Sequence, residues 1–240
     1  MLNLVFFCDK ATAERNAALP DWAVISIGDP CYTANLQEGW LDVLYLGFLD
    51  TEDRDDAFSF SELDAVVIAD FVEDVEERSA STILVHCNSG TSRSAAVAKW
   101  IARYYDLPFN HLYAHHNKLV YLTLHEYGQI LTISAFAAGS LSEEKVMRRL
   151  GLSHAELQKA LQDDSQRADS LAAQRSELSC RIAKIKRLAE EVFGGPTLAR
   201  RWLTRYNPIL GNVPLCELRT ESGEKEVLRI LESISRGGVV

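Results

Sequence analysis

The sequence predicts an α/β fold: a largely parallel sheet with flanking helices, followed by a mostly α-helical region. Short runs rich in Val, Ile and Phe alternate with helix-like segments in the first half, and segments of high helix propensity fill the second. The charge also changes: residues 1–135 carry 20 acidic and 8 basic side chains, and residues 136–240 carry 14 and 17. We therefore expect one domain at residues 1–135 and a different one after it.

The predicted strands of the first half share a high content of Val, Ile and Phe, and they span residues 2–7, 23–27, 43–48 and 82–86. Apolar residues at helical spacing predict helices at residues 61–77, 91–105 and 119–127. Ser61 is the expected N-cap of the first. Ligands of such sheets usually bind at the carboxyl ends of the strands, which is where the fourth strand ends in Cys87.

A strand, a short polar loop and a helix follow one another between Ile83 and Ala98. Backbone N–H groups of such a loop and the first turn of the helix form an anion site. Arg93 adds a guanidinium that can bind a phosphate group through two hydrogen bonds. A helix N-terminus and a nearby cation lower the pKa of a thiol, so Cys87 is expected to act as a thiolate nucleophile on phosphorus.

His86-Cys87, five intervening residues and Arg93-Ser94 resemble the HCx5R(S/T) signature of cysteine-dependent protein tyrosine and dual-specificity phosphatases. The resemblance implies a phosphatase-like domain at residues 1–135. It also implies a protein phosphatase that hydrolyses phosphotyrosine, and phosphoserine or phosphothreonine, through a phosphocysteine intermediate without metal or cofactor. His86 would orient the loop and tune the thiol, and Ser94 would assist breakdown of the intermediate. The residues implied to bind phosphate are Asn88, Ser89, Gly90, Thr91, Ser92 and Arg93.

The leaving oxygen of a phosphomonoester needs a proton donor, and an acidic run follows the third predicted strand. Asp50 stands where that strand ends, as the general acid of dual-specificity phosphatases does, and is our first choice. Asp53 and Asp55 are alternatives because the segment is a few residues longer than usual. The phosphate loop contains no Lys, unlike that of many phosphoinositide phosphatases, which favours phosphoprotein substrates.

Three histidines, His111, His115 and His116, lie close together in the sequence, but they lack the Cys or Asp spacing of a metal site. We interpret them as surface or capping residues and expect no metal. The segment beginning at Asn117 resembles an Asn-Arg-x-Val segment of small bacterial phosphatases, and the sequence assigns it no role.

Five cysteines, an odd number without a CxxC pair, predict a reduced cytoplasmic chain with neither a disulfide framework nor a zinc site. No apolar run reaches membrane-spanning length, and the N-terminus lacks the features of a signal peptide. The acidic first half argues against a nucleic-acid substrate for the Cys87 site.

Residues 136–186 are predicted to form a helical linker. Within it, residues 142–158 have a weak helix-turn-helix-like pattern, which allows contact with DNA. High helix propensity predicts a long helix over residues 163–193, which Gly194 and Gly195 would end. Pro196 precedes the next predicted helix, at residues 197–204.

Residues 187–240 resemble the C-terminal toxin-binding domain of the Xre/MbcA/ParS antitoxin family. The landmarks of the resemblance are Phe193-Gly194, Arg201-Trp202-Leu203, Asn207-Pro208, Leu210-Gly211, Pro214-Leu215, Thr220-Glu221, Gly223 and a final helix holding Val227, Leu228, Ile230 and Leu231. It implies binding of a RES-type toxin, with the tail at residues 236–240 approaching the toxin's active site. The DNA-binding region of that family is usually longer than residues 141–161. A homo-oligomer is compatible with this domain.

Two hypotheses follow. The first is a cysteine-dependent protein phosphatase acting through Cys87. The alternative is an antitoxin-like interaction protein that binds and neutralises a RES-type toxin, with the phosphatase domain as an accessory module.

Overall fold

The chain folds around a four-stranded, fully parallel sheet with the order β1-β4-β2-β3. The computed structural model describes residues 2–30, 34–56, 58–110, 112–137, 142–150, 153–155, 157, 181–205, 207–211, 213–218 and 220–237. The strands are β1 (Leu4–Asp9), β2 (Trp22–Gly28), β3 (Asp42–Gly47) and β4 (Thr82–Cys87). This confirms the predicted α/β class and its parallel sheet.

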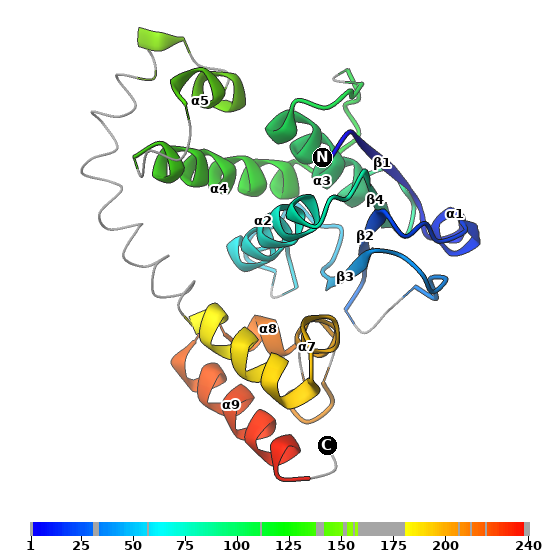
Figure 1. Cartoon of the computed structure of the whole chain (residues 1–240), viewed down its shortest axis with the longest axis vertical. Helices are drawn as coiled ribbons and strands as arrows, with labels where there is room; N and C mark the ends of the chain where they lie inside the picture. Colours follow the sequence, from blue (N-terminus) through cyan, green and yellow to red (C-terminus); the bar gives the residue numbers. More distant parts are fainter. Residues whose placement is uncertain are drawn as a thin grey trace.

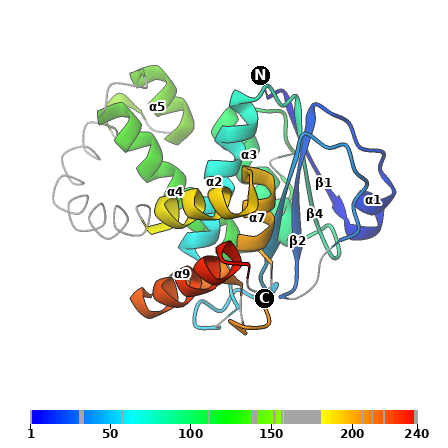
Figure 2. The same ribbon diagram turned by 60° about the horizontal axis from the view of Figure 1, so that its bottom comes forward.

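Helices cover both faces of the sheet, as Figure 2 shows with the strands seen nearly edge-on. The first-half helices are α1 (Lys10–Arg15), α2 (Glu62–Glu77), α3 (Arg93–Tyr105) and α4 (Lys118–Ala137). α2, α3 and α4 lie on one side and the short α1 lies on the other (Figures 1 and 2). The central strand β4 is enclosed, with all six of its residues buried, whereas Phe6 of the edge strand β1 is exposed.

The parallel register brings the carboxyl ends of all four strands to one edge of the sheet. Cys87 of β4 pairs with Asp9 of β1, and Gly28 of β2 pairs with Gly47 of β3. The loops that leave this edge carry residues 29, 48–60 and 88–92. Side chains from distant parts of the sequence can meet there.

Local sequence explains where α2 begins. Ser61 accepts a hydrogen bond from the backbone of Asp64, and the Asp64 carboxylate accepts one from the Ser61 backbone. This capping box satisfies two backbone donors that a helix start leaves unpaired. The prediction of Ser61 as N-cap is confirmed.

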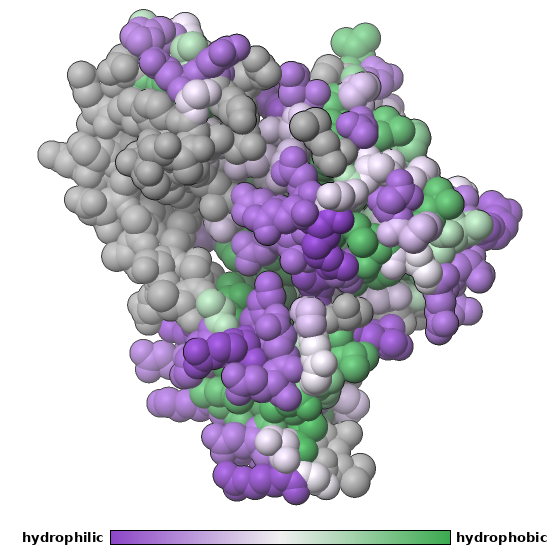
Figure 3. All heavy atoms as spheres, viewed as in Figure 1, coloured by the Kyte–Doolittle hydropathy of each residue, from purple (hydrophilic) through white to green (hydrophobic). Residues whose placement is uncertain are grey.

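The second half ends in a helical unit, which we call the C-terminal unit and define as the described part of residues 181–237. Residues 181–193 are helical, and they are followed by α7 (Pro196–Leu203), α8 (Pro214–Glu217) and α9 (Glu221–Ser235). In Figure 3, a band of hydrophobic residues crosses this unit where the helix of residues 181–193 and α9 lie side by side. Buried residues from both halves, such as Leu203 and Phe71, belong to one hydrophobic core.

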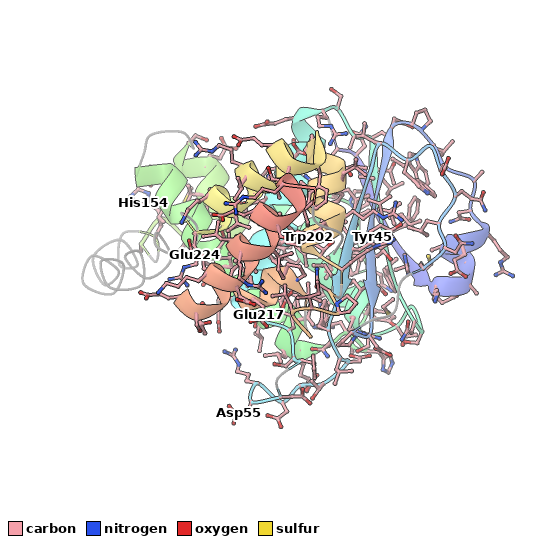
Figure 4. The ribbon with its side chains drawn as sticks, turned by 90° about the horizontal axis from the view of Figure 1, so that it is seen from below. Tyr45, Asp55, His154, Trp202, Glu217 and Glu224 are labelled. Atoms are coloured by element: carbon pink, nitrogen blue, oxygen red, sulfur yellow. The ribbon has the colours of Figure 1, made fainter. Side chains whose placement is uncertain are left out.

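Arg200 of α7 is the main polar link between the C-terminal unit and the sheet domain. Its guanidinium bonds to Asp42 at 2.6 Å and to Asp74 at 3.3 Å, and it lies over the Phe71 ring with 5.0 Å to the centroid. Arg205 lies over the ring of Tyr45 at the same distance. Figure 4 shows Tyr45 of β3 beside Trp202 of α7.

Several predicted helices differ from the observed ones in extent. α4 continues to Ala137 instead of ending at residue 127, and α1 was not predicted. α5 (Glu143–Leu150) forms the first helix of the helix-turn-helix-like pattern, but its expected turn at residues 151–152 lies outside the described residues. The same holds for residues 163–180 of the expected long helix, while residues 181–193 are helical as predicted. None of the described helices is both long and apolar enough to cross a membrane.

Candidate functional site

The loop between β4 and α3 folds closely around the sulfur of Cys87. The Gly90 backbone N–H donates to Cys87 Sγ at 3.3 Å, and Ser94 Oγ lies 3.2 Å from the same sulfur. Cys87 itself is fully buried at the end of its strand. A loop amide and a hydroxyl from the first turn of the helix therefore both face the thiol.

Gly90 allows this loop to lie against the end of β1. It has a φ of +70°, and a Cβ atom built there would stand 2.3 Å from the backbone nitrogen of Asp9. No side chain larger than hydrogen fits at that distance. The single glycine of the loop thus permits close contact between the loop and the neighbouring strand β1.

Burial by itself would raise the pKa of the Cys87 thiol. The hydrogen bonds from Ser94 and from the Gly90 amide, together with the charge of Arg93, outweigh burial and lower that pKa below its usual value. The site therefore favours the thiolate, which is the nucleophilic form of cysteine.

Arg93 is almost fully buried at 3% exposure, and its guanidinium is held from one side. Nη1 donates to Asp29 Oδ1 at 2.8 Å and to the carbonyl oxygens of Gly28 and Phe48. Among the described residues, none accepts a hydrogen bond from Nε, which lies 4.0 Å from Asp50 Oδ2. A buried charged donor without an acceptor is costly, so this edge of the guanidinium is suited to an anionic ligand.

Asp50 lies beside the loop between β4 and α3, close to Arg93. Its Oδ1 accepts from Ser92 Oγ at 2.8 Å and from Asn117 Nδ2 at 2.9 Å. The two alternative acids do not make these contacts: Asp53 Oδ1 accepts from the backbone N–H of Asp55, and both lie on the exposed part of the segment. Figure 4 shows Asp55 on a loop that stands away from the sheet. Of the three candidates, Asp50 is the one that makes a hydrogen bond to the loop around Cys87.

His86 is buried, and because it precedes Cys87 in β4, its side chain lies on the opposite face of the sheet from that of Cys87. Burial lowers the pKa of its imidazole to about 4, so the ring is neutral near pH 7. No described residue hydrogen-bonds to either ring nitrogen. A neutral ring carries no proton for transfer near pH 7, and the orienting role that the resemblance implies for His86 stays a prediction.

Three further residues of the loop between β4 and α3 make hydrogen bonds that hold the loop in place. Asn88 Nδ2 donates to Asp29 Oδ2 at 3.0 Å, and Ser89 Oγ lies 3.1 Å from Thr91 Oγ1. Tyr113 donates to the carbonyl oxygen of Thr91 at 2.8 Å. The loop thus has contacts on both flanks that hold its shape.

Sequence reasoning missed Asp29. It is a single acidic residue without a motif, and its role appears only because β2 ends beside β4 at the same edge of the sheet. That position, at the carboxyl end of a predicted neighbouring strand, was the one available signal. Asn117 had been singled out without a role, and the structure brings it to Asp50.

His115 and His116 are the described members of the histidine group. The part of the chain that the structure describes contains no cluster of three or more His, Cys, Asp or Glu side chains able to hold a metal ion. His116 Nδ1 lies 3.5 Å from Lys99 Nζ, and His115 packs against Tyr113. His111 lies outside the described residues.

The landmarks of the C-terminal unit have structural roles. Phe193 and Trp202 pack with ring centroids 5.5 Å apart, and Asn207 Oδ1 accepts from the backbone of Ile209 to form a turn. Thr220 caps α9 by accepting from the Gly223 backbone, and a Cβ at Gly223 would clash with the backbone of α8. The last residues of the expected toxin-contacting tail, 238–240, lie outside the described residues.

The C-terminal unit is similar to a known protein family. Residues 188–237 match the family model of the antitoxin Xre/MbcA/ParS C-terminal toxin-binding domain. Among curated proteins, none matches the chain. The resemblance stated for residues 187–240 is therefore confirmed, whereas the phosphatase resemblance of residues 1–135 rests on the residues of the Cys87 site.

Proposed function

We propose that this chain combines two functions: its C-terminal unit binds and neutralises a toxin, and its Cys87 site hydrolyses phosphomonoesters. The match of residues 188–237 to a toxin-binding domain carries the first. The convergence of Cys87, Arg93 and Asp50 at one sheet edge supports the second. The two sites are formed by different parts of the chain, so each can be tested without removing the other.

The toxin partner that we propose is of the RES type, which is the class the family resemblance implies. The unit contains the helices α7, α8 and α9, and the landmark contacts at Thr220 and Gly223 hold α8 against α9. The tail that follows Ser235 is the segment proposed to reach the toxin. DNA binding by residues 142–158 and self-association remain predictions of the sequence.

Co-expression with a RES-type toxin from a neighbouring gene tests this function. We expect the full chain to co-purify with the toxin and to restore growth, and a chain that ends at Ser235 to lose most of the protection. Cys87→Ser serves as the matched control, because it changes the other site, and it should protect like the wild type. Failure of the full chain to form a complex, or intact neutralisation after deletion of residues 187–240, would refute toxin binding by this unit.

The phosphatase function is proposed from the chemistry of the site. The Cys87 thiolate attacks phosphorus, Arg93 and the loop amides bind the equatorial oxygens, and the bond to the leaving oxygen breaks as Asp50 transfers its proton to that oxygen. Water then attacks the thiophosphate, Asp50 accepts a proton from it, and Ser94 donates a hydrogen bond to the departing sulfur. Each step uses groups of this chain together with water.

Hydrolysis of an aryl phosphate by the purified full chain tests the enzyme. We expect turnover that Cys87→Ser abolishes and that Asp50→Asn lowers by roughly 100-fold, the usual contribution of a general acid. Asp53→Asn is the matched control and should remain near the wild-type rate. Activity that survives Cys87→Ser would refute the covalent mechanism, and full activity of Asp50→Asn would move the acid to Asp53 or Asp55. Phosphotyrosine and phosphoserine peptides then distinguish the substrate classes.

A further inference from the structure

Asn117 connects three parts of the candidate active site. Its Nδ2 donates to Asp50 Oδ1 at 2.9 Å and to the Thr51 carbonyl oxygen at 3.1 Å. Its backbone N–H donates to the carbonyl oxygen of Ser92 at 3.2 Å. Its Oδ1 accepts from the backbone N–H of Val120 at 3.0 Å, which caps the start of α4. With 3% exposure, this side chain is buried among the segments it joins.

The orientation of the Asn117 amide follows from its partners. The Val120 backbone N–H can only donate, so it requires the amide oxygen, and the Thr51 carbonyl can only accept, so it requires the amide nitrogen. Both hydrogens of Nδ2 therefore have acceptors, one of which is Asp50. The amide acts at once as a helix cap and as a donor to the acid.

The two oxygens of Asp50 consequently have different environments. Oδ1 accepts two hydrogen bonds, from Ser92 Oγ and from Asn117 Nδ2. Oδ2 is the oxygen on the side of Arg93, 4.0 Å from Nε, where the bound phosphate would lie. A carboxyl proton on Oδ1 would compete with these two donors, so the proton of the neutral acid belongs on Oδ2.

We propose that Asn117 is a positioning residue that turns Asp50 so that Oδ2 delivers the proton to the leaving oxygen. This inference rests on the proposed phosphomonoesterase function. The proton moves from Oδ2 to the leaving oxygen while the bond from that oxygen to phosphorus breaks and the Cys87 sulfur bonds to phosphorus. The carboxylate that remains keeps the hydrogen bonds from Asn117 and Ser92, which stabilise its new charge.

A second hydrogen bond also joins the loop that carries Asp50 to the start of α4. The backbone N–H of Lys118 donates to Glu52 Oε1 at 2.9 Å. The first turn of α4 thus directs one backbone N–H group and the positive end of the helix dipole at the segment that carries Asp50. Of the two residues, Lys118 contacts Glu52, whereas Asn117 contacts the Asp50 carboxylate itself.

Asn117→Ser separates the two roles of the side chain. Serine is a good N-cap and can still accept from Val120, but it is too short to reach Asp50. Asn110→Ser is the matched control, because the Asn110 side chain also accepts a hydrogen bond from a nearby backbone N–H, that of Leu112, but in an exposed loop. Both variants are compared with the wild type as full chains.

The readout is the dependence of kcat/KM on the leaving group, measured with phenyl phosphate and 4-nitrophenyl phosphate, because kcat/KM leaves out the later hydrolysis of the thiophosphate that both substrates share. A poor leaving group needs the proton and a good one needs it less, so we expect Asn117→Ser to lower kcat/KM about 10-fold or more for phenyl phosphate and about 2-fold for 4-nitrophenyl phosphate. Asn110→Ser should match the wild type for both substrates. Hydrogen exchange of residues 49–56 should become faster in Asn117→Ser only.

The outcomes distinguish a failure of the positioning role of Asn117 from a failure of the proposed phosphomonoesterase function. Equal losses for the two substrates, or unchanged exchange of residues 49–56 in an active Asn117→Ser protein, would overturn the positioning role alone. If the wild type hydrolyses neither aryl phosphate, the proposed phosphomonoesterase function fails, and the role of Asn117 in proton delivery fails with it.

Discussion

Arg200 of α7 donates to the carboxylate of Asp42 at the start of β3, and the two residues are separated by 158 positions in the sequence. The Asp42 side chain is 2% exposed, and Arg78 donates to the same oxygen at 2.7 Å. Two arginines from different halves of the chain therefore share one buried carboxylate. This relationship fixes the C-terminal unit at the start of β3, the opposite end of the strand from the Cys87 site.

Replacement of Arg200 should destabilise the whole chain. Asp42 would keep Arg78 but lose a short charged hydrogen bond, so we expect Arg200→Met to lower the free energy of unfolding by about 2 kcal/mol. The adjacent Arg201 is exposed, and Arg201→Met should change that free energy by less than about 0.5 kcal/mol. Urea unfolding of the two variants measures the difference. Equal stabilities would mean that the Asp42 contact contributes nothing.

Gly90→Ala should disrupt the loop around Cys87 for two reasons, the positive φ and the close approach to Asp9. Gly194→Ala isolates the first, because Gly194 has a φ of +76° and nothing within 4 Å of a Cβ. We expect a loss of about 1 kcal/mol in unfolding free energy for Gly194→Ala and about 3 kcal/mol for Gly90→Ala, with aryl phosphate hydrolysis lost only in the latter. Thermal unfolding and the hydrolysis assay together check this, and an active, stable Gly90→Ala protein would contradict the observed loop packing.

The Cys87 thiol should ionise at lower pH than an ordinary thiol, whose pKa is about 8.5. The ultraviolet absorbance of the thiolate, taken as the difference between wild type and Cys87→Ser, measures its titration. Ser94→Ala removes a hydrogen bond that lowers the pKa of Cys87 and should move the midpoint upward. Burial and the charge of Asp9 raise the pKa of Cys8 to about 11, so Cys8→Ser should leave the titration below pH 8 unchanged. A Cys87 midpoint at or above the ordinary value would argue against a thiolate nucleophile.

Asp74 should contribute to stability at neutral pH and not in strong acid. Burial acts to raise its pKa, but the hydrogen bond from Arg78 and the charge of Arg200 outweigh burial and lower it. A lowered folded-state pKa means that this stabilisation is complete above the unfolded value of about 3.9 and disappears as the pH falls through the folded value. The stability gap between wild type and Asp74→Asn should therefore be largest near pH 7 and shrink below pH ~4. Urea unfolding at several pH values tests this, and a gap independent of pH would contradict it.

Much of the sheet domain was predictable because its signals are local. β4 is a buried run of β-branched and apolar residues, and the predicted strand ends within one residue of the observed Cys87. Ser61 and Asp64 form their capping box within one turn of chain, which is why the start of α2 was predicted correctly. Agreement of local patterns with the final fold is what makes such elements recognisable in a sequence.

The misses have physical reasons. α4 was predicted to end at residue 127, before Gly128, a poor helix former, but a Cβ there would lie 2.9 Å from Trp100 Nε1 of α3. Because Gly128 has no side chain, α4 can pack closely against α3, and this packing stabilises the helix beyond residue 127. α1 is a six-residue helix that starts with a cap from Asp9 and has little pattern of its own. Asp29 and the Arg200–Asp42 pair depend on contacts between distant segments, which no local pattern reveals.

The central claim is that one chain carries both a toxin-binding unit and a phosphomonoesterase site. The most direct measurement is gel filtration of the full chain co-expressed with a RES-type toxin, followed by an aryl phosphate assay of every fraction. We expect one peak that contains both proteins and hydrolyses the substrate, and a Cys87→Ser peak that keeps the toxin and loses hydrolysis. Separate elution of the toxin, or hydrolysis equal in the two preparations, would contradict it.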